Sequence, residues 1–352
     1  MSGLPPASPR LLALDVFRGL TIAAMILVNN PGSWARVYAP LRHADWHGWT
    51  PTDLIFPFFV FIVGAAIAVA RPKPPRQILR RGAILWGLGL CMAAYPFWPA
   101  ERITGVRILG VLARLGICYA AAALLARRLG PRALVAVVVA LLLGYWLAMA
   151  GYGHLDSKSE NLAARIDQLV LGSHVWSGSK TYDPEGVLST LPAIATCLLG
   201  VFAGRILAGE RTPEQKTLGL FVFGAPLVVL GYLWGWGFPI NKPIWTSSYV
   251  LLTAGQAACA LAFCHWLCDV RGWRRWARPF EIYGVNAITV FVGSGLLAKT
   301  LGLLGWQQPL YRALCASWLP PYAASLAWAL LTVGLWFVLL AIMWRRRWIL
   351  RI

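Results

Sequence analysis

Residues 11–64 read LLALDVFRGLTIAAMILVNNPGSWARVYAPLRHADWHGWTPTDLIFPFFVFIVG. Two apolar runs flank a short polar link, which holds two histidines, an aspartate and three tryptophans. Each run is long enough to begin a helix that crosses a bilayer. A simple connector has no need of such a polar cluster. The sequence therefore predicts a reaction site at one membrane face, held by a frame of helices.

The composition is that of a membrane protein. Of the 352 residues, 59% are hydrophobic and only 13% are charged, with a mean hydropathy of +0.63. Soluble globular proteins carry about 25% charged residues. We predict an all-α, polytopic helix bundle, because a helix satisfies its own backbone polar groups in lipid. The sequence predicts ten membrane-spanning helices, at about 11–30, 50–70, 80–96, 105–126, 131–150, 186–208, 216–236, 246–268, 280–300 and 324–344.

The basic residues predict how this single domain, residues 1–352, is oriented. The net charge is +19, and the Lys and Arg residues bracket the apolar runs. Twenty of them fall on one set of connections and ten on the other, which places the richer set in the cytoplasm. Both termini are then cytoplasmic, including the short segment 1–10, and the links 31–49 and 151–185 face the outside. Orientation explains the charge better than nucleic-acid binding does.

The cysteines predict neither a disulfide framework nor a metal site. Seven of them are scattered, mostly inside apolar runs, which favours packing. Cys264, His265 and Cys268 are close in sequence, but on a helix His265 points away from the two cysteines, and no second pair of ligands follows. No metal is expected.

Two arginines inside apolar spans are candidates for binding an anionic ligand. Arg18 lies three residues after Asp15, on the same helical face. Pairing between these two and contact with a ligand entering from the cytoplasm both remain open. Arg114 lies in GVLARLGICY with no acid within one turn. Because an ionisable group in a span is costly, its partner is either a carboxylate on another helix or a phosphate.

The link after the first span carries the candidate catalytic groups. Asn29 falls in the last turn of that span, where its amide pointing into the bundle could stabilise a developing oxyanion. His43, Asp45 and His47 alternate in LRHADWHGW. An imidazole titrates near neutral pH, as a general base must, although histidines in exposed loops are usually solvated. Trp46 either anchors the membrane interface or offers its aromatic face to a sugar ring.

The second span begins with Thr50-Pro51-Thr52-Asp53. Threonine as N-cap, proline at the first helical position and aspartate at the third form a variant of the capping box. Asp53 is therefore a cap, a ligand-binding group, or both. Pro57 has no N–H to donate to the Asp53 carbonyl. The sequence predicts a kink and a free backbone acceptor at the mouth of the bundle.

Three later stretches place polar groups where they should face the interior. Asp183-Pro184-Glu185-Gly186 opens the sixth span as a capped helix start, and its two carboxylates offer a docking place for a cationic amine. NKPIWTSSY leads into the eighth span with Lys242 and Ser248. EIYGVN begins the ninth span and ends at Asn286.

Six ordered blocks are recognisable together, namely LDVFRGLTIAAMILVNNPG, LRHADWHGWTPTDLIFPFFVFIVG, VLARLGICY, YDPEGVLSTLPAI, NKPIWTSSYVLLTAG and YGVNAITVFVG. They resemble the heparan-α-glucosaminide N-acetyltransferase family of transmembrane acyltransferases, in a compact bacterial form. The resemblance implies an enzyme of the bacterial inner membrane. It implies transfer of an acetyl group from cytoplasmic acetyl-CoA to the amino group of a glucosamine-type sugar on the periplasmic side.

The resemblance also assigns residues. The family's catalytic histidine lands on His43, within RHADW, and its active-site asparagine lands on Asn29. His47 and Asp45 differ from the lysosomal member and inherit no role. The family's large luminal domain has no counterpart here, which implies a small amino sugar rather than a polymer. We expect coenzyme A to contact Arg114, Arg18, Asn286 and Ser248. We expect the sugar to contact Asp183, Glu185, Asp53, Trp46 and Lys242.

Two other functions are open on the sequence. An amino-sugar permease without chemistry would share the spans and the interior polar groups, although the inverted repeats that favour a transporter are not visible. An acyltransferase that modifies cell-envelope polysaccharide would share every feature. The sequence also leaves open a homodimer and an acetyl-His43 intermediate. It predicts no partner other than the two substrates and membrane lipid.

Overall fold

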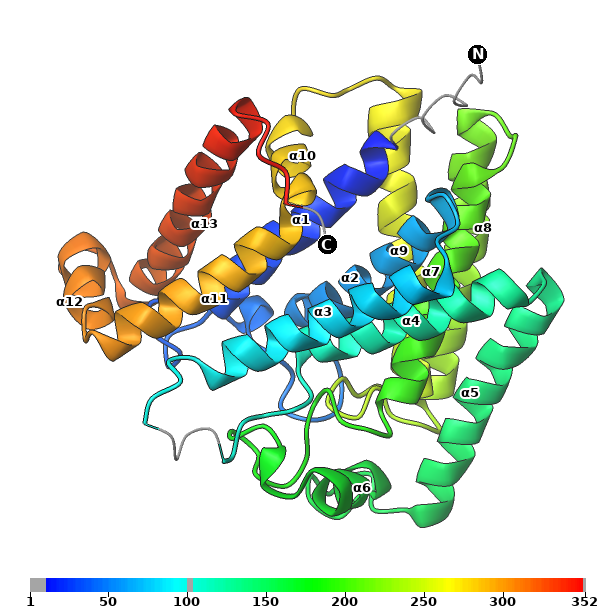
Figure 1. Ribbon diagram of the computed structural model, residues 1–352, viewed down its shortest axis with the longest axis horizontal. Coiled ribbons are helices and arrows are strands. Elements are labelled where there is room, and N and C mark those ends of the chain that lie inside the picture. Colours follow the sequence, from blue (N-terminus) through cyan, green and yellow to red (C-terminus); the bar gives the residue numbers. More distant parts are fainter. Residues whose placement is uncertain (1–10, 100–103, 351–352) are drawn as a thin grey trace.

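The computed structural model describes residues 11–99 and 104–350, and all regular secondary structure within these ranges is helical. The predicted all-α helix bundle is therefore confirmed. Figure 1 shows the long helices leaning against one another, with the loops and the short helix α6 below them. The segment 1–10, predicted as a cytoplasmic N-terminus, lies outside the described residues.

Eight of the ten predicted spans have a counterpart with enough length and apolar character to cross a bilayer. In the described part of the chain, seven are continuous: α1 (Leu12–Asn29), α2 with its preceding 3-10 turn (Pro51–Val69), α5 (Pro131–Tyr152), α7 (Thr190–Ala208), α8 (Pro213–Gly235), α9 with its final π turn (Ser247–Val270) and α13 (Pro321–Arg345). The eighth is broken into α10 (Arg278–Val285) and α11 (Ala287–Leu303), which meet at 79°.

The other two predicted spans correspond to α3 (Pro75–Ala94) and α4 (Val111–Arg128). These helices are long, but α3 carries three arginines in its first two turns and α4 ends in two more. The basic residues lower the mean hydropathy of both helices. The count of ten spans is therefore not confirmed and stays a prediction.

Close contacts between glycines hold the central helices together. A Cβ atom built on Gly64 of α2 would lie 1.9 Å from the Cys197 carbonyl oxygen of α7, and one on Gly200 would lie 2.0 Å from the Phe61 oxygen. Glycine at these positions lets two backbones approach with no intervening side chain, as is typical of packed membrane helices. α1 and α10 meet in the same way at Gly19 and Gly284.

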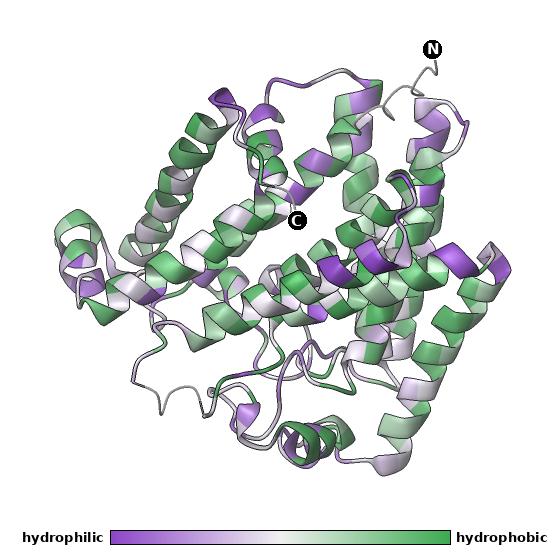
Figure 2. Cartoon of the chain, viewed as in Figure 1, coloured by the Kyte–Doolittle hydropathy of each residue, from purple (hydrophilic) through white to green (hydrophobic). Residues whose placement is uncertain are grey.

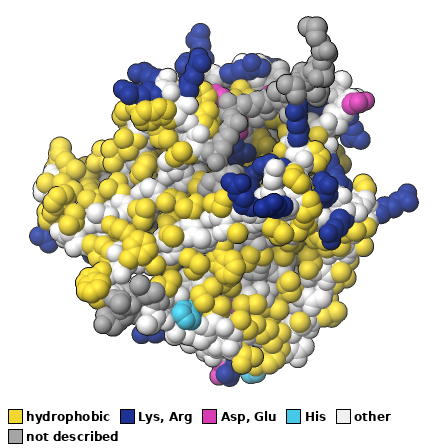
Figure 3. Space-filling model, viewed as in Figure 1, with side chains coloured by type: hydrophobic (Ala, Val, Ile, Leu, Met, Phe, Trp, Pro, Cys, Tyr) yellow, Lys and Arg dark blue, Asp and Glu magenta, His cyan; other side chains and the backbone are white. Residues whose placement is uncertain are grey.

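The connections gather at two ends of the bundle. We call one the basic end, formed by residues 71–81, 127–132, 205–216, 271–278 and 345–347. The other is the loop end, formed by residues 30–50, 153–189 and 236–246. Figure 2 shows hydrophilic residues concentrated toward the helix ends, and Figure 3 shows Lys and Arg gathered mainly over the upper part of the visible face.

Hydrogen bonds join the three loop-end segments into one layer. The Trp46 indole donates to the Leu155 carbonyl at 2.9 Å, and the Gly48 N–H donates to the Ile240 carbonyl at 2.7 Å. The layer also contains α6 (Leu162–Leu171), capped by the Asn161 side chain. The two links predicted to share a face do so. Which side of a membrane that face occupies stays a prediction.

Candidate active site

The end of the 31–49 link is folded over the start of α2. A 3-10 turn, Ala39–Leu41, precedes His43 and brings the chain back toward the bundle. Thr50 and Asp53 form the predicted capping box, in which the Thr50 N–H donates to Asp53 Oδ2 at 3.0 Å. The Ala44 N–H donates to the same oxygen at 3.0 Å. One buried carboxylate therefore fixes both the helix start and the segment beside His43.

Asp53 also orients His43. Its Oδ1 lies 2.6 Å from His43 Nδ1, and Asp53 is only 1% exposed, whereas the His43 side chain is 52% exposed. A contact this short to a carboxylate requires a proton on Nδ1. Nε2 then carries the lone pair and is the nitrogen left for a substrate, an arrangement suited to a general base.

Lys242 completes the cluster from the segment before α9. Its Nζ lies 3.3 Å from Asp53 Oδ1 and 3.1 Å from His43 Nδ1. Burial lowers the pKa of Lys242 below its usual value, and the nearby Asp53 and Glu185 carboxylates offset only part of this. Lys242, predicted as a sugar contact, is thus brought to the candidate catalytic histidine.

The backbone acceptor predicted near Pro57 is present and is used. The Asp53 carbonyl accepts a hydrogen bond from the Tyr249 hydroxyl of α9 at 2.5 Å. Tyr249 is fully buried. The missing N–H of Pro57 therefore lets α9 fix the backbone of Asp53.

The other polar residues of the link lie at different depths. Asn29 is the last residue of α1 and is exposed, so its amide does not point into the packed bundle as predicted. His47 is engaged on both nitrogens, with Asp156 Oδ1 at 2.9 Å from Nε2 and Asn241 Nδ2 at 3.3 Å from Nδ1. Asp45 is exposed. Of the two histidines, His43 alone leaves Nε2 without a protein partner in the described structure.

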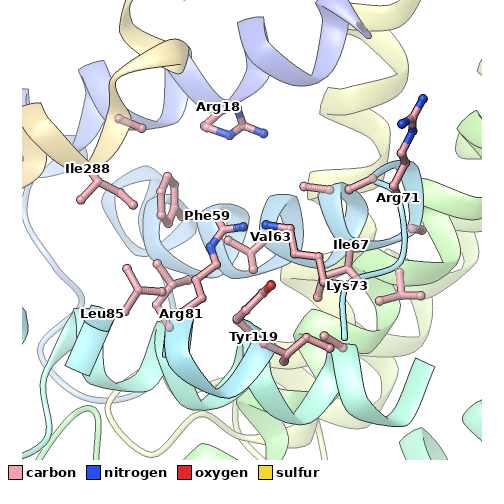
Figure 4. A pocket seen from close by; sticks show the side chains of 18 of the residues that line it. Arg18, Phe59, Val63, Ile67, Arg71, Lys73, Arg81, Leu85, Tyr119 and Ile288 are labelled. Carbon is pink, nitrogen blue, oxygen red and sulfur yellow. The ribbon is translucent and has the colours of Figure 1, made fainter. Parts of the chain in front are cut away.

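A basic pocket opens at the other end of α2. It has a volume of about 590 Å³. Its cationic lining comes from Arg18, Arg71, Lys73, Arg81, Arg127 and Arg205. Figure 4 shows Arg18, Lys73 and Arg81 directed toward one space, with Phe59 and Val63 of α2 behind it. Such a pocket suits a ligand with several negative charges and an apolar portion.

Helix α2 connects this pocket to His43. Phe59 lines the pocket and Asp53 holds His43, and these residues are six positions apart. At 1.5 Å per residue, the inner wall of the pocket lies about 9 Å along the helix axis from Asp53. The two candidate sites therefore face each other along one helix, from opposite ends of the bundle.

Arg18 lies where an anionic ligand could reach it. Its Nη1 pairs with Asp15 at 2.8 Å and donates to the Gly284 carbonyl at 3.4 Å. Arg18 also lines the basic pocket. Both interpretations of Arg18 are therefore compatible with the structure.

Arg114 does not line the basic pocket, contrary to the prediction of a coenzyme A contact. It is fully buried near the loop end of α4, where Nη2 donates to the Gly186 carbonyl at 3.2 Å and to the Ser189 hydroxyl. Its guanidinium also lies over the Trp245 ring, with Cζ 5.0 Å from the centroid. Arg114 fixes the approach to α7, as an interhelical partner.

The carboxylates predicted to dock an amine are already paired. Asp183 and Glu185 are buried, and both contact Arg107, whose Nε donates to Asp183 Oδ2 at 2.7 Å. Burial alone would lower the pKa of Arg107, but Glu185 and Asp183 outweigh it and raise that pKa. A protein guanidinium therefore fills the place expected for the substrate amine.

The helix start predicted at Asp183 is also wrong, because α7 begins at Thr190. Residues 183–189 instead form turns held by Asp167 of α6. The Asp167 carboxylate accepts from the Asp183 N–H at 3.0 Å and from the Val187 N–H at 2.8 Å. This long-range acceptor competes successfully with the local capping signal.

Two further residues predicted to contact coenzyme A have structural partners in this arrangement. Asn286 is 1% exposed and bonds the backbone of Trp348 and Leu350, at 3.2 and 3.1 Å, so it holds the C-terminal segment. Ser248 is buried at the loop end, donating to the Phe238 carbonyl at 2.6 Å. It is far from the basic end, where we expected coenzyme A.

Trp46 and Asp53 are likewise engaged by other parts of the protein. Trp46 is 8% exposed, and its ring packs edge-on to Tyr182 with centroids 5.5 Å apart. Asp53 is used by His43, Lys242 and the cap. Both side chains are buried, and their contact with a sugar stays a prediction.

Most of the basic pocket was missed by sequence reasoning. Arg71, Lys73, Arg81 and Arg127 served there only to predict orientation. One signal was available, since Arg80 and Arg81 are adjacent in an apolar helix and therefore point about 100° apart, so the two side chains meet different surroundings. The guanidinium of Arg81 indeed lies over the Tyr119 ring, with Cζ 4.8 Å from the centroid. Within the described residues, no group of three potential metal ligands is present.

Comparisons with known proteins show the family of this chain. A family model described as "Heparan-alpha-glucosaminide N-acetyltransferase, catalytic" matches residues 10–233. The human heparan-alpha-glucosaminide N-acetyltransferase is 30% identical over 368 residues, covering 83% of this chain and 53% of its own. The mouse protein is 30% identical over 365 residues, covering 82% and 54%. The chain spans about half the length of these curated relatives, and it belongs to the heparan-α-glucosaminide N-acetyltransferase family of transmembrane acyltransferases.

Proposed function

We propose that this protein moves an acetyl group from acetyl-CoA, bound at the basic end, to the amino group of a glucosamine-type sugar at the loop end. The basic end faces the cytoplasm of a bacterial cell and the loop end faces the periplasm, following the distribution of Lys and Arg. The observation that carries the proposal is the His43–Asp53 pair at one end of α2, opposite a basic pocket at the other end.

The chemistry requires a base at the loop end. The sugar amine must lose a proton as its nitrogen attacks the thioester carbonyl, the C–N bond forms and the C–S bond breaks. His43 Nε2 takes the proton, while Asp53 keeps the ring in the required tautomer and stabilises the imidazolium. The proton returns to the leaving thiolate, which departs as coenzyme A. A preceding acetyl-His43 intermediate would use the same nitrogen as nucleophile.

The oxyanion needs a donor. Asn29 is exposed at the end of α1 and is free to turn its amide toward a carbonyl, and Lys242 supplies a positive charge beside His43. We assign the polarisation of the thioester carbonyl to Asn29, since a donor that forms its bond only in the transition state accelerates the reaction.

The basic pocket suits coenzyme A. Its cations would bind the phosphates, and the apolar wall formed by Phe59, Val63 and Leu115 leads along α2 toward His43. The acceptor class rests on the names of the relatives, and a small amino sugar fits the exposed position of His43. Arg114, Asn286 and Ser248 are not part of this proposal.

The direct test uses purified protein with labelled acetyl-CoA and a panel of amino sugars. We expect label in the N-acetyl sugar, with glucosamine among the acceptors and glucose inactive. Reconstituted vesicles that accumulate sugar without forming product would instead identify a permease. Activity restricted to envelope polysaccharide would transfer the proposal to a polymer acceptor.

A variant of the pocket tests where the donor binds. Arg81→Gln removes one cation from the pocket while keeping most of the side-chain volume. We expect the KM for acetyl-CoA to rise roughly tenfold or more, because a charge-assisted hydrogen bond is lost, with a smaller effect on the sugar KM. Arg275→Gln, an exposed change at the same end but outside the pocket, is the matched control. An unchanged KM in a folded Arg81→Gln protein would remove the pocket from the proposal.

A further inference from the structure

A second cavity lies outside the reaction path, in a groove on the side of the bundle. It has a volume of about 800 Å³, with α7 between α5 and α8. The groove is almost entirely apolar, and its walls include Val139, Leu142, Leu199, Phe202, Phe223 and Leu227. Other lining side chains are substantially exposed, as Val139 is at 47%, among them Val135 and Leu230. In a membrane the groove faces the acyl chains of the lipid.

Two cations stand at one end of this groove. Arg205, in the last turn of α7, and Arg211, in the connection to α8, both line it. Arg211 is exposed, whereas Nη1 of Arg205 is buried and has no hydrogen-bond partner within the described residues. None of the described residues that line the groove is acidic. The groove therefore offers two positive charges, and its described lining holds no acidic side chain.

The dimensions match one leaflet of a bilayer. α8 lines the groove from Phe223 to Trp234, eleven residue steps or about 16 Å of helix. The hydrocarbon core of a bilayer is about 30 Å thick. The apolar part therefore spans about half of that core, and the two arginines lie where the headgroups of the leaflet at the basic end begin.

We propose that this groove binds an anionic phospholipid of that leaflet. One acyl chain would lie between α5 and α8, and the headgroup phosphate would accept hydrogen bonds from Arg205 and Arg211. A zwitterionic lipid would bring its own ammonium group beside two guanidinium groups, in a groove whose described lining holds no acidic side chain. A lipid with net negative charge is favoured for this reason.

The lipid site adjoins the basic pocket without depending on its function. Arg205 lines both cavities. Bound lipid would neutralise Arg205 and hold the end of α7. The binding itself does not require that the basic pocket take acetyl-CoA, so it can be tested in protein without substrates.

The test measures lipid retained by the purified full-length protein after delipidation in detergent. Native mass spectrometry would follow the uptake of phosphatidylglycerol and of phosphatidylcholine with identical chains. We expect phosphatidylglycerol to bind with a one-to-one stoichiometry, and phosphatidylcholine at least tenfold more weakly. Arg211→Gln should weaken the anionic lipid roughly tenfold. Val139→Trp, which fills the groove without changing charge, should exclude the lipid.

Arg275→Gln is the control, because it removes an exposed cation from the same end but outside the groove, and it should bind lipid as the wild type does. Equal retention of the two lipids, or equal loss in Arg211→Gln and Arg275→Gln, would overturn the proposal in favour of ordinary annular lipid. Full competition by glycerol phosphate would also overturn it, by showing a free-phosphate site without acyl recognition. Thermal melting of each variant identifies any that fails to fold, and Val139→Trp tests the groove independently of Arg211.

Discussion

At the scale of single residues, Asp53 combines three functions. It caps the start of α2, sets the tautomer of His43 and balances the charge of Lys242. Each function uses the same buried carboxylate, so the geometry of the candidate base depends on the fold of the helix start. The His43 side chain is half-exposed, so a substrate in the aqueous phase can reach it.

We expect His43→Ala to abolish turnover while acetyl-CoA still binds, because the proton acceptor is lost but the basic pocket is intact. Asn29→Ala should reduce kcat roughly a hundredfold or more, as the loss of an oxyanion donor does. Steady-state kinetics together with calorimetric titration of acetyl-CoA would separate the two effects.

His47→Ala is the internal control, because His47 lies four residues from His43 and is already bonded to Asp156 and Asn241. We expect this variant to have only a small effect on kcat. Near-normal kcat in His43→Ala would reject the assignment. An inactive His47→Ala protein with a normal His43 variant would move the base along the link.

The sequence could single out His43 and Asn29 as candidate catalytic residues, but not the partners around them. The resemblance to the family suggests roles for residues that lie in matching motifs. The contact between His43 and Asp53 depends on how the 31–49 link folds back, which no local pattern specifies. The same limit explains the failure at Asp183 and Glu185, since Arg107 lies 76 residues before Asp183 and nothing local predicts their pairing.

At the scale of elements, the contact between α2 and α7 determines the position of both candidate sites, because α2 carries Asp53 at one end and Phe59 and Val63 in the pocket wall. The helices approach at Gly64 and Gly200 more closely than any side chain permits. Gly64 and Gly200 are visible in the sequence, but the sequence alone does not show that the helices that carry them pack against each other.

Gly200→Ala should lower the thermal stability and the activity together. Its Cβ would lie 2.0 Å from the Phe61 carbonyl oxygen, so α2 and α7 must separate, at a cost of about 1–3 kcal/mol by analogy with overpacked cores. Gly144→Ala in α5, where nothing lies within 4 Å of the added atom, should change neither property. Differential scanning fluorimetry and the transfer assay would show this. Equal melting temperatures for Gly200→Ala and the wild type would contradict the tight contact.

The turns held by α6 give a pH dependence with a defined sign. Burial raises the pKa of Asp167 to about 6, although the Asp183 and Val187 N–H groups oppose it. The folded state therefore holds this proton more tightly than the unfolded chain, whose Asp titrates near 3.9. The stabilisation is present below about pH 4 and is lost as the pH rises through about 6.

In Asp167→Asn this contribution is absent. The difference in stability between wild type and variant should thus change in favour of the wild type by up to about 3 kcal/mol as the pH falls from about 6.5 to 4. Melting temperatures across this range would measure it. Asp45→Asn, an exposed carboxyl in the same layer, should show no such trend. Parallel curves for wild type and Asp167→Asn would reject the assignment.

At the scale of the whole molecule, composition and charge predicted the all-α bundle, and the apolar runs located the long helices closely. The length of an apolar run is a local property of the sequence, so eight spans could be predicted from such runs. The sequence did not predict the break of 79° between α10 and α11, where Asn286 bonds the distant segment at Trp348 and Leu350.

The orientation can be tested with an impermeant thiol reagent on intact cells. Ser177→Cys, exposed at the loop end, should be labelled before lysis, whereas Arg275→Cys at the basic end should be labelled only after it. The asymmetry follows from the greater number of Lys and Arg at the basic end. A parent protein with its seven cysteines replaced by alanine removes the background. The reverse order of labelling would invert the proposed direction of transfer.

The C-terminal segment held by Asn286 has a practical consequence for anyone handling this protein. Ile349 and Leu350 are part of the wall of the basic pocket, so an affinity tag or fluorescent fusion joined close behind them would begin at the entrance that we propose for the donor. A flexible spacer rich in Gly and Ser, or insertion of the tag into an exposed loop far from that entrance, would keep the pocket open during purification and assay.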